Sequence, residues 1–260
     1  MGLLRGLGVA ASGMLAAQTR MDVLANNLAN AATTGYQRDT AVTESFGDML
    51  LSRFFDQPGR VAGAAPPVGP WGAGVQVVAT AARLSGGPLH YTGGPLDVAI
   101  HGDGLFAVQT AAGLRYTRAG AFMQDAQGRL TTLEGNAVLA GGQPVVAPGE
   151  AISIAEDGTV SAAGRALGQL DIVSAAAAGA LRKEGANLWA PVGQGQPGTL
   201  MPPSATGYTL RVGFLEGSNV DPALEMVNLI ETMRAYEVDQ KAIQAQDQTL
   251  ARAVEEVGQG

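Results

Sequence analysis

The sequence predicts an α+β protein with long α-helices at its N- and C-termini and a central antiparallel β domain. Apolar residues recur every seven residues at both ends of the chain, whereas the middle alternates with a period of two. The heptads predict that the terminal helices form a coiled-coil-like terminal domain. We expect this domain at 1–35 and 218–260, linker or extended segments at 36–82 and 201–217, and the β domain at 83–200.

The N-terminal helix is expected from Leu3 to Ala31. Its main apolar column consists of Leu7, Met14, Met21 and Leu28, and Leu24 lies in the companion column. Between Met1 and Thr34 only Arg5, Arg20 and Asp22 are charged. A helix without a charged face is usually covered on more than one side, so we expect other helices to pack around this one.

The C-terminal helix is expected to begin at Asp221 and Pro222, an N-cap residue followed by proline at the first helical position, and to run to Val257. One column consists of Leu229, Tyr236, Ile243, Leu250 and Val257. Its companion column consists of Met226, Met233, Gln240, Asp247 and Val254, and therefore turns polar in mid-helix.

The middle of the chain predicts three hairpins, at 105–117, 121–132 and 152–162. Each places a short polar turn with a glycine between strand-like flanks; these glycines are Gly113, Gly128 and Gly158. Only glycine adopts the positive φ of such loops at little cost. Two stretches rich in proline and glycine, 57–74 and 190–207, bracket the hairpins and are interpreted as linkers or long surface loops.

The composition excludes several function classes. The formal net charge is −7, so the chain lacks the basic surface that nucleic acid or an anionic membrane requires. There is no cysteine, and there are two histidines, so we expect no metal site and no Ser/His/acid set. The string AIHGDGLF, with His101 and Asp103, is interpreted as a tight turn between strands. We expect no enzyme activity, no cofactor and no small-molecule substrate.

Three segments resemble one known family. The first, ASGMLAAQTRMDVLANNLANAATTGYQR, resembles the N-terminal signature of bacterial flagellar rod and hook axial proteins, through Asn27, Leu28, Ala29, Asn30, Gly35 and Tyr36. The second, TGGPLDVAIHGDGLFAVQTAAGLRYTRAGAFMQDAQGRLTTLEGNAVLA, is similar to the central motif of that family, although Leu105 and Ala119 depart from it. The third, GSNVDPALEMVNLIETMRAYEVDQKAIQAQDQTL, is similar to its C-terminal helix.

The resemblance implies a structural subunit of the flagellar rod, of the distal-rod type or the related proximal-rod type. It implies export through the flagellar type III apparatus and helical polymerisation into the axial drive shaft. The implied partners are further copies of the chain, other rod and hook subunits, and the export apparatus. The implied location is the flagellar basal body, in the cell envelope and outside the cytoplasm.

An assembly interface is expected along the helices and at the end of the first one. Its residues are Leu7, Met14, Met21, Leu24, Asn27, Leu28, Asn30, Gly35, Tyr36, Leu229, Tyr236, Ile243 and Leu250. An amide at a covered surface costs less to desolvate than a lysine and can both donate and accept hydrogen bonds. We therefore expect Asn27→Lys or Asn30→Lys to leave the β domain folded and to block polymerisation.

A second function class is a secreted β-rich binding or adhesion protein with a coiled-coil stalk. The apolar segment 7–17 follows Arg5 and could be the core of a signal peptide, which motivates this alternative. The heptad pattern continues straight through any cleavage point, which favours an uncleaved N-terminus.

Overall fold

The computed structural model describes residues 2–45, 49–52, 67–71, 74–82, 84–174, 181–185, 187–191 and 207–258. The chain forms two compact units. Unit 1 comprises Met1–Asn26, Asp39–Ala81 and Ala223–Gly260, and unit 2 comprises Asn27–Arg38 and Ala82–Pro222. Much of the two predicted linker stretches, 57–66 with 72–73 and 192–206, lies outside the described residues.

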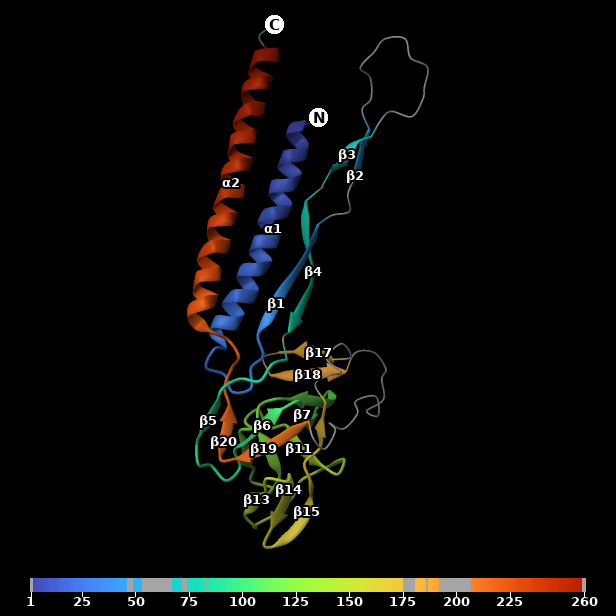
Figure 1. Cartoon of the computed structure of the whole chain (residues 1–260), viewed down its shortest axis with the longest axis vertical. Helices are drawn as coiled ribbons and strands as arrows, with labels where there is room; N and C mark the ends of the chain where they lie inside the picture. The colour runs from blue at the N-terminus through green and yellow to red at the C-terminus, as the bar shows by residue number, and fades with distance from the viewer. Residues whose placement is uncertain are drawn as a thin grey trace. The chain divides into compact units, whose positions relative to one another are not determined.

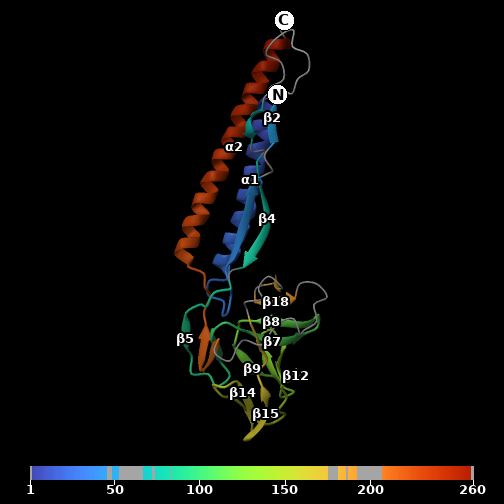
Figure 2. The same cartoon turned by 45° about the vertical axis from the view of Figure 1, so that its right-hand side comes forward.

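Two long helices form at the ends of the chain, as the apolar period predicts. Helix α1 spans Gly2–Ala29 and helix α2 spans Pro222–Gly258. Within unit 1 they run side by side (Figure 1 and Figure 2). No helix among the described residues has the length and apolar character that crossing a membrane requires.

The prediction of a coiled-coil-like terminal domain is wrong. The column of Leu229, Tyr236, Ile243 and Leu250 is only half-buried. Met226 and Met233 of the companion column are 47% and 49% exposed. Polar residues of α2 face α1 instead. A Cβ at Gly6 would lie 2.4 Å from Gln246 Nε2, and one at Gly13 would lie 2.6 Å from Asp239 Oδ2. Glycine on one helix thus makes room for long polar side chains on the other.

Strands also accompany the helices in unit 1. Strand β1 (Asp39–Ser45) pairs with β4 (Val75–Ala82), and β2 (Met49–Ser52) pairs with β3 (Pro67–Trp71). The backbone N–H of Val75 in β4 donates to Ser12 Oγ of α1 at 3.3 Å. Helix α1 is therefore covered by a β ribbon as well as by a helix, which a helix-only terminal domain does not describe.

Unit 2 contains the central antiparallel β domain that the two-residue period predicts. Its largest sheet has the strand order β17-β18-β8-β7-β11-β10-β9, with β12 beside β11 and β16 beside β7. These strands are β7 (Leu105–Thr110), β8 (Gly113–Thr117), β9 (Phe122–Gln124), β10 (Leu130–Thr132), β11 (Ala137–Ala140), β12 (Gln143–Pro144), β16 (Ile172–Val173), β17 (Leu181–Glu184) and β18 (Leu188–Pro191).

Three smaller sheets complete unit 2. The first joins β13 (Ile152–Ile154), β14 (Thr159–Ala162) and β15 (Arg165–Gln169). The other two pair β19 (Tyr208–Val212) with β6 (Val98–Gly102), and β20 (Phe214–Glu216) with β5 (Leu89–Tyr91). Residues 208–216, which the expected boundaries assigned to an extended segment, thus form two strands that are part of unit 2.

The three predicted hairpins are confirmed. They are β7–β8, β9–β10 and β13–β14, and each pair is antiparallel. Gly113, Gly128 and Gly158 in their turns all have positive φ. The main core of unit 2 packs aliphatic residues of these strands around Phe106 and Phe122, whose rings meet edge to face at 5.1 Å.

Candidate functional site

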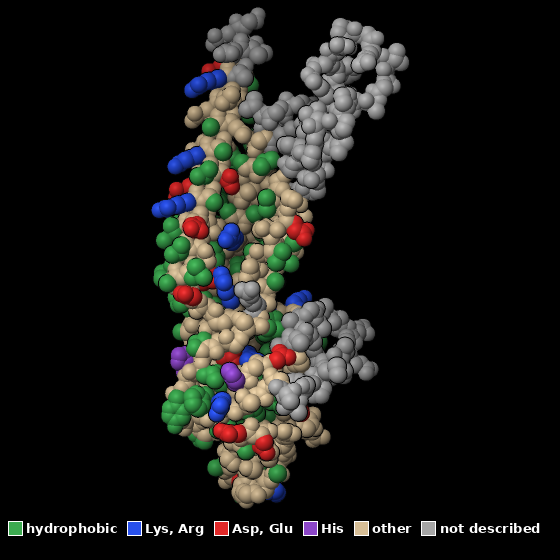
Figure 3. Space-filling model, viewed as in Figure 1, with side chains coloured by type: hydrophobic (Ala, Val, Ile, Leu, Met, Phe, Trp, Pro, Cys, Tyr) green, Lys and Arg blue, Asp and Glu red, His purple; other side chains and the backbone are tan. Residues whose placement is uncertain are grey.

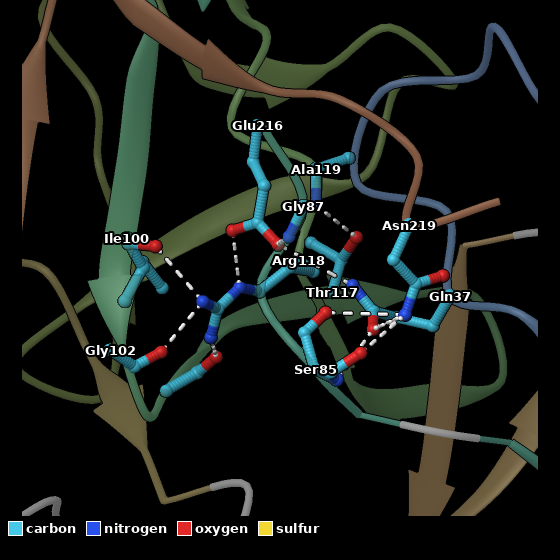
Figure 4. Close-up of polar contacts among 11 residues, drawn as sticks. Gln37, Ser85, Gly87, Ile100, Gly102, Thr117, Arg118, Ala119, Glu216 and Asn219 are labelled. Carbon is cyan, nitrogen blue, oxygen red and sulfur yellow. Dashed lines mark hydrogen bonds and ion pairs between the residues drawn. The ribbon is translucent and has the colours of Figure 1, made fainter. Parts of the chain in front are cut away.

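Unit 2 contains a buried ion pair. Arg118 directly follows β8, and Glu216 is the last residue of β20. Arg118 Nε lies 2.6 Å from Glu216 Oε2, and the two side chains are only 5% and 1% exposed. The two terminal guanidinium nitrogens donate to three carbonyls, Nη1 to that of Gly104 and Nη2 to those of Ile100 and Gly102 (Figure 4). Burial of this charged pair is thus offset by hydrogen bonds on every side of the guanidinium.

Amide side chains extend this pair into a network, which we call the polar junction: Gln37, Ser85, Arg118, Glu216 and Asn219. Glu216 Oε1 accepts from the backbone N–H of Gly87 at 3.0 Å and from Gln37 Nε2 at 3.5 Å. Gln37 Oε1 accepts from Ser85 N and from Asn219 Nδ2, both at 3.0 Å. Figure 4 shows these side chains converging from separate parts of the chain.

The polar junction holds the segment that follows α1. The backbone N–H of Gly35 donates to the carbonyl of Glu216 at 2.8 Å, and that of Arg38 donates to Asn219 Oδ1 at 2.7 Å. Lys183 of β17 donates to the carbonyl of Gln37 at 2.7 Å and places its ammonium 3.8 Å from the centroid of the Tyr36 ring. A cation over an aromatic face is attracted by the ring quadrupole.

Several residues of the expected assembly interface are buried within the subunit itself. Tyr36 is fully buried and its hydroxyl donates to Asn27 Oδ1 at 3.1 Å, and Asn27 is fully buried too. Gly35 is also buried. These three residues thus make contacts inside one subunit, because the chain folds back at the end of α1. Their place in an assembly interface stays a prediction.

The other expected interface residues stay a prediction. Leu24 is buried, and the remaining residues are half-buried: Leu7, Met14, Met21, Leu28, Asn30, Leu229, Tyr236, Ile243 and Leu250. Sequence reasoning missed the roles of Gln37, Arg118, Glu216 and Asn219. All four lie within or beside the three segments that resemble rod and hook axial proteins. That resemblance was the signal that could have pointed to them.

The burial of Asn27 changes the expected effect of a lysine there. We expect Asn27→Lys to lower the free energy of unfolding by about 3 kcal/mol or more, because a charge would be placed in a buried site. Asn30→Lys, at a half-buried position of the same turn, is the control and should cost about 1 kcal/mol or less. Urea denaturation measures both. Equal stability of the two variants would contradict the assignment of Asn27 to the subunit interior.

The arrangement positions backbone segments through side chains that are hydrogen-bonded to one another. Arg118 is committed to Glu216 and to three carbonyls. His101 in β6 is exposed, whereas Asp103 in the turn after β6 is half-buried and accepts a hydrogen bond from the Ser174 hydroxyl. Within the described residues, no group of three His, Cys, Asp or Glu side chains is placed to hold a metal ion. The geometry is that of a buried network that holds backbone segments in place.

Three family models match the chain. Residues 7–37 match "Flagella basal body rod protein", residues 99–162 match "Flagellar hook protein FlgE/F/G D1 domain", and residues 211–256 match "Flagellar basal body rod FlgEFG protein C-terminal". Each matched segment supplies members of the polar junction: the first supplies Gln37, the second Arg118, and the third both Glu216 and Asn219. The three segments thus meet in the folded unit 2.

Curated relatives resemble the chain from end to end. The flagellar basal-body rod protein FlgG of Agrobacterium fabrum is 39% identical over 94% of this chain and 96% of its own length. FlgF of Caulobacter vibrioides is 32% identical, covering 97% of both chains. The hook-basal body complex protein FlhO of Bacillus subtilis is 30% identical over 98% of this chain and 99% of its own. The chain therefore belongs to the family of flagellar basal-body rod proteins.

Proposed function

We propose that this chain is a structural subunit of the flagellar rod, located in the basal body. It assembles with further copies of itself and with other axial proteins, reaches the rod through the flagellar type III apparatus, and has no catalytic role. The observation that carries the proposal is the polar junction, in which all three family segments meet.

A rod subunit must resist twisting, and the polar junction fixes the backbone within unit 2. It holds the backbone just after α1, at Gly35 and Arg38, and just before α2, at Glu216 and Asn219. Buried hydrogen bonds to charged groups are shorter and stronger than neutral ones and fix geometry. Both covalent routes from the terminal helices into unit 2 are therefore held by the same buried network.

Deletion of the gene tests the proposal. The deletion strain should be non-motile and lack complete hook-basal bodies in electron micrographs, and the wild-type gene on a plasmid should restore both. Complete hook-basal bodies in the deletion strain would refute the proposal. The secreted binding protein is the rival: mass spectrometry finding an N-terminus near Gln18 would favour it, whereas an intact Met1 or Gly2 favours the rod subunit.

Exposed apolar side chains on α2 indicate where neighbouring subunits pack. Five of them gather in the first part of the helix, at Leu224, Met226, Val227, Ile230 and Met233. Figure 3 shows the exposed hydrophobic side chains along this part of α2, with Lys and Arg side chains farther along the helix. A contiguous exposed apolar patch is a typical interaction site.

Crosslinking in assembled rods checks this surface. The chain has no cysteine, so Met226→Cys and Met233→Cys each introduce a single thiol. We expect both variants to form crosslinks between subunits with a short thiol-specific reagent. Thr232→Cys is the matched control, because Thr232 is buried on the other face of the same helix and should not crosslink. Equal crosslinking of all three thiols would contradict the assignment of this face.

A further inference from the structure

We infer that residues 207–219, which we call the closing segment, control when unit 2 folds. This segment completes the β-sheet core of unit 2, neutralises its buried charge and forms the docking site for its N-terminal part. Unit 2 then stays unfolded until nearly the whole chain is available, since only α2 follows the closing segment.

The backbone of the closing segment completes the hydrogen bonding of β6 and its neighbours. Strand β19 pairs with β6 along its whole length, from Tyr208 opposite Gly102 to Val212 opposite Val98. Beyond the strands, the Gly207 carbonyl accepts from Asp103 N at 3.1 Å, and Gly213 N donates to the Asp97 carbonyl at 2.8 Å. The first three residues of β6 are fully buried. Without β19, their backbone groups would lose partners in a place where unpaired groups are costly.

The closing segment also completes the core and neutralises its charge. Leu210 is buried in the main core together with Val98 and Ile100. Glu216 supplies the only carboxylate that ion-pairs with Arg118 among the described residues. A buried cation left without its partner is strongly unfavourable, so folding of the rest of unit 2 around Arg118 is disfavoured until Glu216 arrives.

The N-terminal part of unit 2 docks onto the closing segment. Gly35 N binds the Glu216 carbonyl, Gln37 contacts both Glu216 and Asn219, and Arg38 N binds Asn219 Oδ1. Residues 35–38 therefore have no complete docking surface before the closing segment is in place. The order of events is the closing segment first and residues 35–38 second.

Sequence separation makes this step slow. Arg118 and Glu216 are 98 residues apart, and Gln37 and Asn219 are 182 apart. Contacts of such separation form late and limit the folding rate, because the loop entropy is lost before the contact is gained. Delayed folding keeps the chain unfolded, so that it can pass through an export channel. This consequence rests on the proposed function, whereas the folding order does not.

A disulfide that holds β19 on β6 tests the inference in the full chain. His101 and Thr209 are exposed cross-strand partners, so His101→Cys with Thr209→Cys places two thiols within bonding range. If docking of the closing segment limits folding, the oxidised variant should refold from urea about tenfold faster or more than its reduced form, because loop closure is already made.

A matched control uses a local pair. Ser153 and Ser161 are cross-strand partners in the β13–β14 hairpin, with their hydroxyl oxygens 2.9 Å apart. Oxidised Ser153→Cys with Ser161→Cys should refold less than about threefold faster than its reduced form. Two results would overturn the inference: equal acceleration by both disulfides, or slower unfolding with unchanged refolding in the His101/Thr209 variant. The assay uses purified protein, so failure of the deletion test would remove the export consequence and leave the folding result standing.

Discussion

Gly35→Ala is expected to prevent stable folding of unit 2 and to abolish motility. Gly35 has φ +68°, and a Cβ there would lie 2.5 Å from Ala119 N and 2.7 Å from both Ala119 Cα and the Arg118 carbonyl carbon. These are backbone atoms, which cannot rotate away as the end of a side chain can. The left-handed backbone adds about 1–2 kcal/mol for any other residue. We expect a total loss above about 4 kcal/mol, measured by urea denaturation.

Gly141→Ala separates the cost of the left-handed backbone from the cost of the close contact with residues 118 and 119. Gly141 has φ +60°, close to that of Gly35, but nothing lies within 4 Å of a Cβ at that position. This variant should lose only the conformational part, about 1–2 kcal/mol, and should remain folded and motile. Similar stability of the Gly35 and Gly141 variants would show that the close approach to residues 118 and 119 does not constrain the fold.

Glu216→Gln is expected to have the second-largest effect. The substitution keeps the shape of the side chain but leaves the buried Arg118 guanidinium without a counter-charge. Breaking one partner of a buried ion pair typically costs about 3–5 kcal/mol, because the remaining charge stays desolvated. We expect a loss of that size in the free energy of unfolding and a strain that builds few or no rods.

Glu184→Gln is the matched control for an ion pair. Glu184 pairs with Arg115 at 2.5 Å, but its side chain is 46% exposed. Solvent-exposed pairs contribute about 0–1 kcal/mol, so this variant should be nearly as stable as the wild type. A double replacement, Arg118→Met with Glu216→Met, should cost less than the sum of the two single changes. Full additivity would contradict a direct coupling between the two charges.

The extent of the helices and the hairpins could be predicted because their signals are local. Asp221 and Pro222 mark the start of α2, and a glycine marks each hairpin turn. The packing of the helices could not be predicted in the same way. Heptad counting weighs apolar residues, whereas the observed contacts place Gly6 and Gly13 against Gln246 and Asp239.

The polar junction could not be predicted from local sequence patterns. Its members come from residues 37 to 219, and no spacing rule within one sequence joins positions so far apart. Asn27 illustrates the difficulty. Its place on the helix suggested contact with another subunit, but the chain turns at Gly35 and returns Tyr36 to Asn27 from nine residues away. Only the path of the backbone after the helix reveals this partner.

The position of Lys183 allows the docking of residues 36 and 37 to be followed by chemical modification of lysine. Lys183 and Lys241 are the only lysines of the chain. The amine of Lys183 lies against the Tyr36 ring and the Gln37 carbonyl, whereas Lys241 is exposed on α2. An acylating reagent is therefore expected to modify Lys241 readily and the half-buried Lys183 more slowly, and to modify Lys183 faster when residues 36 and 37 detach. The ratio of the two modified peptides in a mass spectrum reports, without any introduced label, how often the N-terminal segment leaves its place.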